Sequence, residues 1–192
     1  METREFEMRT ARLLLRPHRL EDVDDIFEYA RDPEWGRYLT APMPYLREHA
    51  VEFVEDRIRT SRDLWPVWAM VLDGKVVGGV GIEIDDEYAT GALGYSLAKE
   101  HWGSGLVAEA ARAVVAWAFR ERGLAKVYAY ADARNAQSLR VMEKLGMTRE
   151  GVLRSHRTLR EERVDDVYYG LLREEWERDE RQRSVADPRV ST

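Results

Sequence analysis

Cysteine is absent from this chain, and its absence excludes several classes of chemistry. A chain without cysteine has no disulfide bonds, no thiolate metal ligands and no cysteine nucleophile. Histidine is scarce as well, and His18, His49 and His101 have no spacing that forms a metal site. We therefore expect a fold held together by its hydrophobic core and a functional site without a bound metal.

Long hydrophobic runs are also missing. No window approaches the roughly 20 apolar residues of a membrane span, and the N-terminal segment has no apolar core of signal-peptide type. The charge balance is acidic, with 30 Lys and Arg against 36 Asp and Glu, which argues against nonspecific nucleic-acid binding. We expect a soluble, cytoplasmic protein that does not contact a membrane and has no strong nucleic-acid signal, although its composition allows a local basic patch.

Length and composition favour one domain. The chain has 192 residues, of which 44% are hydrophobic. This is enough to form one well-buried hydrophobic core but too few to form two domains of ordinary size. Residues 177–192 are charged and poor in apolar side chains. We therefore expect a domain over residues 1–176, followed by a disordered tail.

The spacing of apolar residues predicts alternating strands and helices. Helices are expected to begin near residues 21, 47, 107 and 135. Strands are expected at residues 12–17, 65–72, 75–84, 90–98, 126–132, 147–157 and 163–172. This order predicts an α/β fold with a mixed, mostly antiparallel twisted sheet of about seven strands flanked by helices, in which a meander precedes a right-handed βαβ crossover.

Two glycines, Gly103 and Gly105, stand directly ahead of the helix expected from residue 107. The first turn of a helix leaves its N–H groups without intrahelical partners, and glycines let the main chain approach an anion there. The signal is weak by itself, because an ordinary strand-to-helix turn uses the same residues. The spacing matches neither a P-loop nor a dinucleotide fingerprint.

The strand expected before these glycines contains Gly91 and Gly94. Glycine inside a strand indicates a bulge or the close approach of another backbone or a ligand. If this strand diverged from its neighbour, a ligand would pair with the free main-chain groups like an extra strand. The two glycine pairs together predict a site for an elongated, anionic ligand.

Three motifs in the expected order resemble the GCN5-related N-acetyltransferases (GNAT), in particular the RimJ- and RimL-type group that acetylates N-termini of ribosomal proteins. The resemblance extends from residue 10 to residue 176. The most specific segments are Leu93-Gly94-Tyr95-Ser96-Leu97, Trp102-Gly103-Ser104-Gly105-Leu106-Val107-Ala108-Glu109-Ala110, and Asn135-Ala136-Gln137-Ser138 with Glu143-Lys144-Leu145-Gly146-Met147.

The resemblance implies acetyl-CoA as the co-substrate and assigns three sets of residues to it. Its pyrophosphate would bind the main-chain amides of Gly103, Ser104, Gly105, Leu106, Val107 and Ala108. Its pantetheine would pair with the main chain of Ser96, Leu97, Ala98 and Lys99, and Asn135 and Ser138 would line the thioester end.

The same resemblance and the requirements of acetyl transfer indicate candidate catalytic groups. Main-chain N–H groups near Leu97, freed by a bulge, are candidates for stabilising the oxyanion. The tyrosine that many family members carry as proton donor is Met142 here, so the role falls to Ser138 or water. Ser138 equally fits a structural role as the N3 residue of a helix capped by Asn135.

Further departures leave the general base open. A frequent family glutamate is replaced by Ala92, and Glu83, Tyr130, His156 and water remain as candidates. Trp102 and Val107 also differ from the common pattern at the first and last positions of the glycine motif.

The predicted function is acetyl-CoA-dependent N-acetylation of a primary amine, either a protein N-terminus or a small molecule. Two rivals remain: a non-catalytic acyl-CoA-binding module and a structural or ribosome-associated protein. A homodimer through the C-terminal strands is compatible with the sequence. The arginines at 154, 157, 160 and 163 fit a solvated hairpin turn or an acidic partner, and Trp35 and Tyr38 fit packing or a pocket wall.

Overall fold

The computed structural model describes residues 6–60 and 63–186 and contains one mixed sheet between two helical layers. The strands are β1 (Met8–Arg9), β2 (Leu14–Arg16), β3 (Val67–Leu72), β4 (Lys75–Asp85), β5 (Thr90–Leu97), β6 (Lys126–Asp132), β7 (Thr148–Leu159) and β8 (Glu162–Leu172). The helices are η1 (Leu20–Asp22), α1 (Val23–Ala30), α2 (Arg47–Arg59), η2 (Lys99–His101), α3 (Leu106–Arg120), α4 (Ala136–Lys144) and α5 (Arg173–Ala186).

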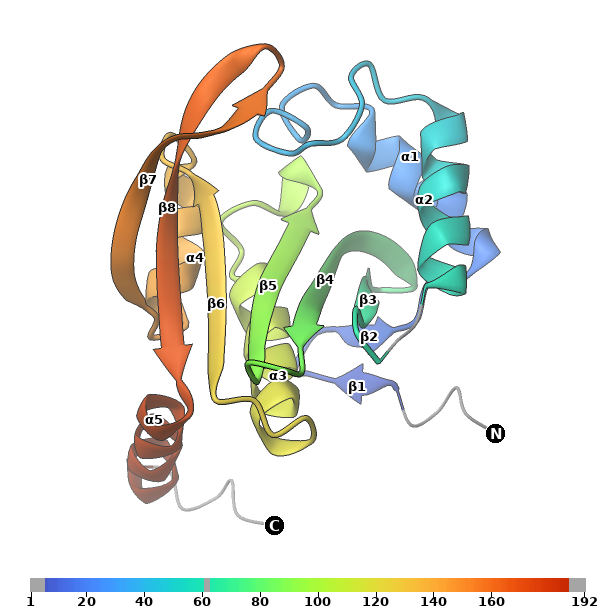
Figure 1. Ribbon diagram of the computed structural model, residues 1–192. Helices are drawn as coiled ribbons and strands as arrows, with labels where there is room; N and C mark the ends of the chain where they lie inside the picture. The colour runs from blue at the N-terminus through green and yellow to red at the C-terminus, as the bar shows by residue number, and fades with distance from the viewer. Residues whose placement is uncertain (1–5, 61–62, 187–192) are drawn as a thin grey trace.

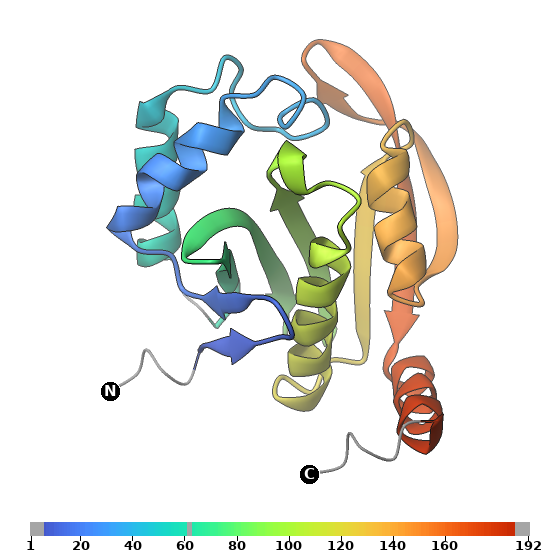
Figure 2. The same ribbon diagram turned by 180° about the vertical axis from the view of Figure 1, so that it is seen from behind.

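The strand order in the sheet is β1-β2-β3-β4-β5-β6-β8-β7, and only the β5–β6 pair is parallel. The parallel pair is connected through α3, as the βαβ crossover predicted. Helices α1 and α2 lie on one face of the sheet, and α3 and α4 lie on the other (Figures 1 and 2). The predicted α/β class is confirmed, with eight strands because the two-residue β1 was missed.

Each face of the sheet has its own core. The larger core packs α3 against β4, β5 and β6, and includes Val114, Phe119, Ile82 and Val127. The smaller core joins α1 and α2 to the sheet through Ile26 and Val54, among others. Helices α3 and α4 cover one face of β6 and β8, whereas the opposite face of these two strands, toward the viewer in Figure 1, carries no helix (Figures 1 and 2).

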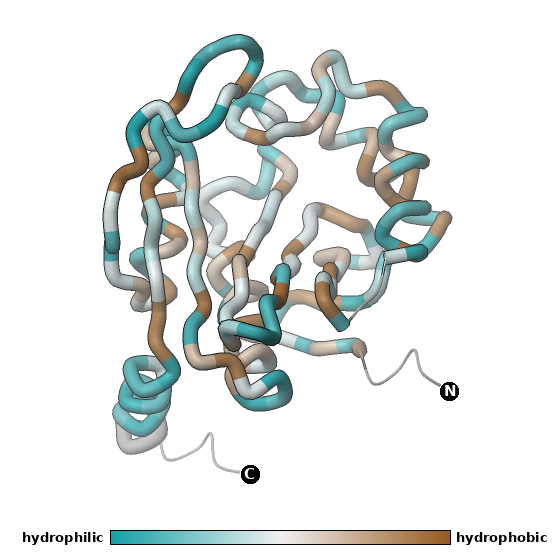
Figure 3. The backbone as a smooth tube through the Cα atoms, in the orientation of Figure 1, coloured by the Kyte–Doolittle hydropathy of each residue, from teal (hydrophilic) through white to brown (hydrophobic). Residues whose placement is uncertain are grey.

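The C-terminal segment differs from the prediction. Helix α5 continues to Ala186, so the disorder expected from residue 177 is wrong for residues 177–186, while residues 187–192 lie outside the described part. The helix is hydrophilic along its length (Figure 3), which explains the prediction. It is fixed by Trp176, whose ring stacks on Phe119 at 5.2 Å, and by an ion pair of 2.9 Å between Arg120 and Glu180.

Candidate active site

The start of α3 forms a main-chain cradle. Gly103 and Gly105 have φ values of +78° and +84°, a left-handed conformation that favours glycine. A Cβ atom on Gly103 would meet nothing within 4 Å, and one on Gly105 would meet only the Arg12 Nη2 atom, at 3.6 Å. The space above both residues is therefore open to a ligand.

The amides of the first turn are directed at this open space. The bond from Glu109 N to Gly105 O, 3.1 Å long, is the first i to i−4 bond of the helix, so the preceding N–H groups of Leu106, Val107 and Ala108 have no intrahelical acceptor. The peptide dipoles add roughly half a positive charge at this end. The predicted cradle residues thus form a surface suited to a phosphate group.

A cluster of contacts fixes the first turn of α3 to the segment before β2. The Glu109 carboxylate accepts hydrogen bonds from Thr10 Oγ1 at 2.6 Å and from Arg12 Nε at 2.7 Å. Arg12 Nη1 also donates to the carbonyl of Ser104 at 3.0 Å. Burial opposes the ionisation of Glu109, but the bonds from Thr10 and Arg12 outweigh it and lower the pKa of this carboxyl. These contacts join the first turn of α3 to the segment before β2 and so hold the cradle in place.

Strands β5 and β6 pair over a short distance and then diverge. Their parallel ladder joins Thr90, Gly91 and Ala92 to Lys126, Val127 and Tyr128, and it ends there. Beyond Ala92, the rest of β5 continues to pair with β4 alone. The divergence of the two strands is visible in Figure 1. The predicted free edge beside the cradle is therefore present.

The hydrogen-bond pattern identifies which main-chain groups face β6. Ala98 N donates to Val77 O at 2.7 Å, and successive residues of an antiparallel strand point their main-chain groups to opposite sides. The groups of Ser96 and Gly94 therefore face β4. Those of Leu93, Tyr95 and Leu97 face β6, where no ladder bond reaches them.

The bulge expected in β5 is absent. The register between β4 and β5 is unbroken from Thr90 to Leu97, whereas a register shift occurs between β3 and β4 at Met70 and Val71. The free amides near Leu97 therefore result from the divergence of β5 and β6. The space around Gly94 is open, because this residue is exposed and a Cβ there would meet nothing within 4 Å, whereas a Cβ on Gly91 would lie 2.8 Å from Leu124 Cδ1.

Trp102 connects the cradle to the end of β5. Its indole Nε1 donates a hydrogen bond of 2.9 Å to the carbonyl of Leu97, on the side that faces β6. The departure from the common family residue at this position therefore has a structural role. It satisfies the last main-chain acceptor of β5 and fixes the Leu97 peptide relative to Gly103.

The predicted thioester end contains Asn135, Ser138 and a residue that the sequence reasoning had not assigned to the site. Asn135 Oδ1 accepts a bond of 3.1 Å from Ser138 N, which is the predicted helix cap. The Ser138 hydroxyl lies 2.9 Å from the Tyr95 hydroxyl, which also donates to Ser138 O at 3.1 Å. Burial raises the pKa of Tyr95 to about 12, although its bond with Ser138 acts in the opposite direction.

Met142, which replaces the common tyrosine, is buried in the core with 1% of its surface exposed. The Tyr95 phenol, on β5, contacts the first turn of α4 through Ser138. A hydroxyl pair of Tyr95 and Ser138 thus lies where the family pattern led us to expect a tyrosine on α4.

The candidates for the general base lie in two different places in the structure. Tyr130 stacks on Tyr168 at 4.9 Å, and Tyr168 Oη lies 3.3 Å from His156 Nε2, so two of the candidates share one cluster. Glu83 is exposed and paired in register with Ala92, five residues before Leu97. At ~3.4 Å per residue this separation is about 17 Å, so Glu83 and the Leu97 amide are not brought together.

The basic hairpin is not free in solvent. Arg160 donates to the carbonyls of Gly36 at 2.6 Å, Arg37 at 2.8 Å and Leu39 at 3.2 Å, and so joins the tip of the β7–β8 hairpin to the segment between α1 and α2. Arg157 pairs with the buried Asp166 at 2.9 Å. In the same segment, Trp35 packs between Tyr29 and Tyr45, which confirms the packing interpretation for this residue.

The histidines and carboxylates form no metal site in the described residues, where no group of three ligands was found. His18 is buried against Phe53, and burial lowers its pKa to about 4. In the described part of the chain, no helix has the length and apolar character needed to cross a membrane.

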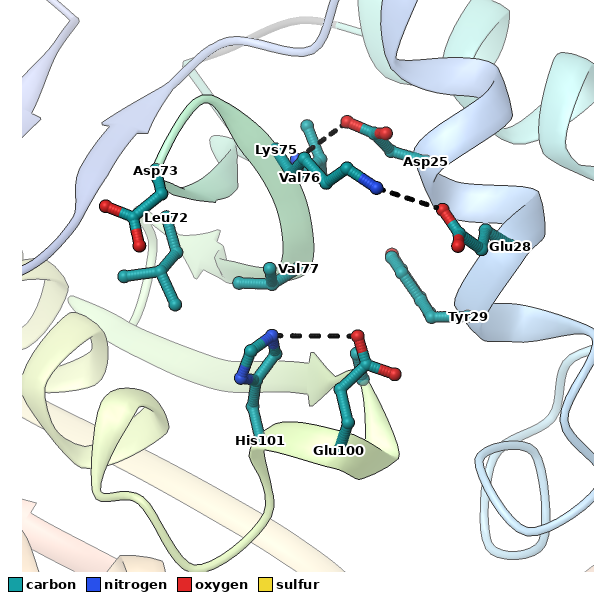
Figure 4. Close-up of a pocket in the computed structure, with 11 residues that line it drawn as sticks. Asp25, Glu28, Tyr29, Leu72, Asp73, Lys75, Val76, Val77, Glu100 and His101 are labelled. Carbon is teal, nitrogen blue, oxygen red and sulfur yellow. Dashed lines mark hydrogen bonds and ion pairs between the residues drawn. The ribbon is translucent and has the colours of Figure 1, made fainter.

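A cavity of about 270 Å³ lies beside η2 (Figure 4). Its wall includes Ala98, one of the predicted pantetheine residues, but none of the cradle residues. The polar groups around it already pair with one another: Asp25 accepts from Val76 N at 2.8 Å, and Lys75 lies 3.5 Å from Glu28. This cavity is distinct from the cradle and from the divergent strands.

An open mixed sheet with a glycine cradle beside diverging strands is the architecture of the acyl-CoA N-acyltransferases. The acetyltransferase of the GNAT family from Bacillus anthracis has this fold, with a TM-score of 0.80 and 26% identity over 88% of this chain and 99% of its own. Residues 12–148 match the acetyltransferase (GNAT) domain, and the chain belongs to this family. It is an N-acetyltransferase.

Relatives support the same conclusion. The N-acetyltransferase p20 of Bacillus licheniformis, itself uncharacterised, is 28% identical over 176 residues, covering 87% of this chain and 96% of the relative. YdaF of Bacillus subtilis strain 168, provisionally named a ribosomal N-acetyltransferase, is 33% identical over 126 residues, covering 65% of this chain and 69% of the relative. GNAT enzymes use acetyl-CoA, so the resemblance seen in the sequence is confirmed at the level of family and fold.

Proposed function

We propose that the protein transfers the acetyl group of acetyl-CoA directly to a primary amine within a ternary complex. The acceptor is a protein N-terminus or a small-molecule amine. The observation that carries the proposal is the end of the β5–β6 ladder at Ala92, which leaves an unpaired edge of β5 from Leu93 to Leu97 that leads to the cradle at Gly103 and Gly105. The similarity to YdaF supports a protein N-terminus as one acceptor class.

The residues present fit acetyl-CoA. The amides of Gly103, Gly105, Leu106, Val107 and Ala108 would hold the pyrophosphate. The Ser104 amide, also predicted to bind it, instead donates to the carbonyl of His101 at 3.3 Å. The main chain of Ser96, Leu97, Ala98 and Lys99 would run beside the pantetheine. Asn135 and Ser138 would line the thioester end. When bound, acetyl-CoA supplies a thioester whose carbonyl carbon forms a C–N bond with the amine while its C–S bond breaks.

The chain contributes oxyanion stabilisation and orientation. The Leu97 amide faces the space between β5 and β6 and would donate to the developing oxyanion, and the Tyr95 amide has the same orientation. One such donor contributes about 3 kcal/mol of transition-state stabilisation. Holding both reactants in one site supplies much of the remaining acceleration.

Two proton transfers complete the reaction. Ser138 Oγ, oriented by Tyr95, or a water molecule donates the proton that the leaving sulfur requires. The proton of the amine passes to the cluster of Tyr130, Tyr168 and His156, or through water. Glu83, the other predicted base, lies too far from the Leu97 amide to take that proton directly, so it would act only through water.

Isothermal calorimetry with CoA, followed by thiol release from acetyl-CoA in the presence of an amine and peptide panel, tests this function. We expect CoA binding and thiol release that depends on an acceptor, with the acetylated product identified by mass spectrometry. CoA binding without transfer to any acceptor would instead favour the non-catalytic acyl-CoA-binding module. Failure to bind CoA would exclude both functions.

A further inference from the structure

Building on the proposed function, we propose that the acceptor is an amine with a second cationic group, held over the rings of Tyr128, Tyr130 and Tyr168 and paired with Glu83. These four residues are called the acceptor platform. The class of acceptor is thus a diamine or a longer polycation, in which one nitrogen reacts and another is recognised.

The platform is on the open face of the sheet. Val127, Ala129 and Ala131 belong to the core beneath α3, so the alternating residues Tyr128 and Tyr130 point to the opposite face. On β8, Val167 and Tyr169 likewise belong to that core, and Tyr168 points to the open face. The three tyrosines therefore share one surface, which no helix of the described chain covers (Figures 1 and 2).

The rings form an ordered stack. Tyr168 lies between the others, with its centroid 4.9 Å from that of Tyr130 and 6.4 Å from that of Tyr128, and both pairs are nearly parallel. Tyr130 keeps 46% of its surface exposed. Aromatic faces carry negative potential, which attracts ammonium groups.

The charge around the stack is negative. On β4, Ile82 and Ile84 belong to the core, so Glu83 points to the same open face as the tyrosines. It has no ion-pair partner among residues 6–60 and 63–186. Burial raises the pKa of Tyr128, and the charge of Glu83 raises it further, which indicates that the two side chains are near each other.

The cations near the platform are already neutralised. Lys126 is paired with Glu150 at 2.7 Å, and Arg157 is paired with Asp166 at 2.9 Å. The carboxylate of Glu83 therefore remains available to a ligand, and Asp85, on the same face of β4, adds a second negative charge near Tyr128. A substrate with its own carboxylate would be repelled here, whereas a second ammonium would be attracted.

The distance along the sheet between Glu83 and the Tyr95 amide allows the two nitrogens of a diamine acceptor to have different partners. Glu83, Ala92 and Tyr128 are in one register row, and the Tyr95 amide is three residues further along β5. This separation is about 10 Å at ~3.4 Å per residue, so one ammonium at Glu83 would leave another amine near the Tyr95 amide, which is the nearer of the two candidate oxyanion donors. Gly94 lies between Ala92 and Tyr95 on β5. Because it has no side chain, the sheet surface between these two residues is open to a ligand.

Three amines with the same carbon chain test the proposal. Pentylamine has one charge, cadaverine has a second ammonium, and δ-aminovalerate has a carboxylate in its place. With saturating acetyl-CoA and the full chain, we expect kcat/KM for cadaverine to exceed that for pentylamine at least tenfold, with δ-aminovalerate the poorest. Equal values for the three, or a preference for δ-aminovalerate, would overturn the proposal.

Substitutions in the acceptor platform test which residues cause the preference for cadaverine over pentylamine. Glu83→Gln is expected to bring the ratio of cadaverine to pentylamine close to one without changing CoA affinity, and Tyr130→Leu to raise KM for cadaverine. Glu55→Gln on α2 and Tyr88→Leu, at an exposed tyrosine in the β4–β5 turn, are matched controls that should keep the ratio. An unchanged ratio in Glu83→Gln would remove Glu83 from the platform.

If none of the three amines is acetylated, calorimetric titration of the CoA-bound protein with cadaverine tests the acceptor platform directly. Binding that Glu83→Gln weakens tenfold supports the platform, and failure to bind at millimolar concentration overturns it. Failure of the proposed function is a different result, because the protein would then either not bind CoA or bind CoA without transferring the acetyl group to any member of the amine and peptide panel.

Discussion

Replacing Gly105 with valine should weaken CoA binding at least a hundredfold. Gly105 is the N-cap of α3 with φ at +84°, and its Cβ position opens onto the cradle. A branched side chain there would occupy the space of the phosphate and strain the backbone, because a left-handed residue other than glycine costs about 1–2 kcal/mol. Calorimetric titration with CoA measures the effect.

Gly123→Val is the matched control for strain. Gly123 follows the same helix at its other end, has φ at +67°, and a Cβ there would meet nothing within 4 Å. Both variants should lose a similar free energy of unfolding in urea titrations, but only Gly105→Val should lose CoA. Retained CoA affinity in a folded Gly105→Val protein would count against the cradle.

Replacing Ser138 with alanine should lower kcat about a hundredfold while leaving CoA affinity nearly unchanged, because a general acid typically contributes 10²- to 10⁴-fold. Tyr95→Phe should lower kcat by a smaller factor, since it removes the hydroxyl 2.9 Å from Ser138 Oγ but leaves Ser138 in place. Steady-state kinetics with separate determination of kcat and KM resolves the two effects.

The pH dependence gives a second measure of this pair. The pKa of Tyr95 is raised to about 12 by burial, so its phenol keeps its proton throughout the working range and loses it only well above pH 10. The loss in Tyr95→Phe should therefore be the same at pH 7 and pH 9. Asn135→Ala, which removes the cap but no hydroxyl, should cost about 1 kcal/mol of stability. Equal losses of kcat and CoA affinity in Ser138→Ala would return Ser138 to a structural role.

Local patterns in the sequence predicted the elements of the site correctly. The three- and four-residue spacing after Gly105 predicts α3, and its glycines adopt the positive φ that the cradle requires. The glycines of the strand before it drew attention to β5. These features are readable because they depend on residues close together in the chain.

The contacts that complete the site could not be predicted, because they join residues far apart in the chain. Tyr95 reaches Ser138 across 43 positions, and Arg160 reaches Gly36 across 124. No single-sequence period reports such pairs. The same reason explains the missed end of α5, whose polar sequence suggested disorder although Trp176 anchors it on Phe119.

The direction of the main chain in β5 offers the sharpest test of the central claim, that CoA binds between the cradle and the free edge of β5. Amide hydrogen exchange should be followed residue by residue with and without CoA. Binding in this position predicts slowed exchange at Leu106, Val107 and Ala108 and at Tyr95 or Leu97. The neighbouring Gly94 and Ser96 amides, already directed at β4, should change little. Protection confined to another surface, or equal protection of all four β5 amides, would contradict it.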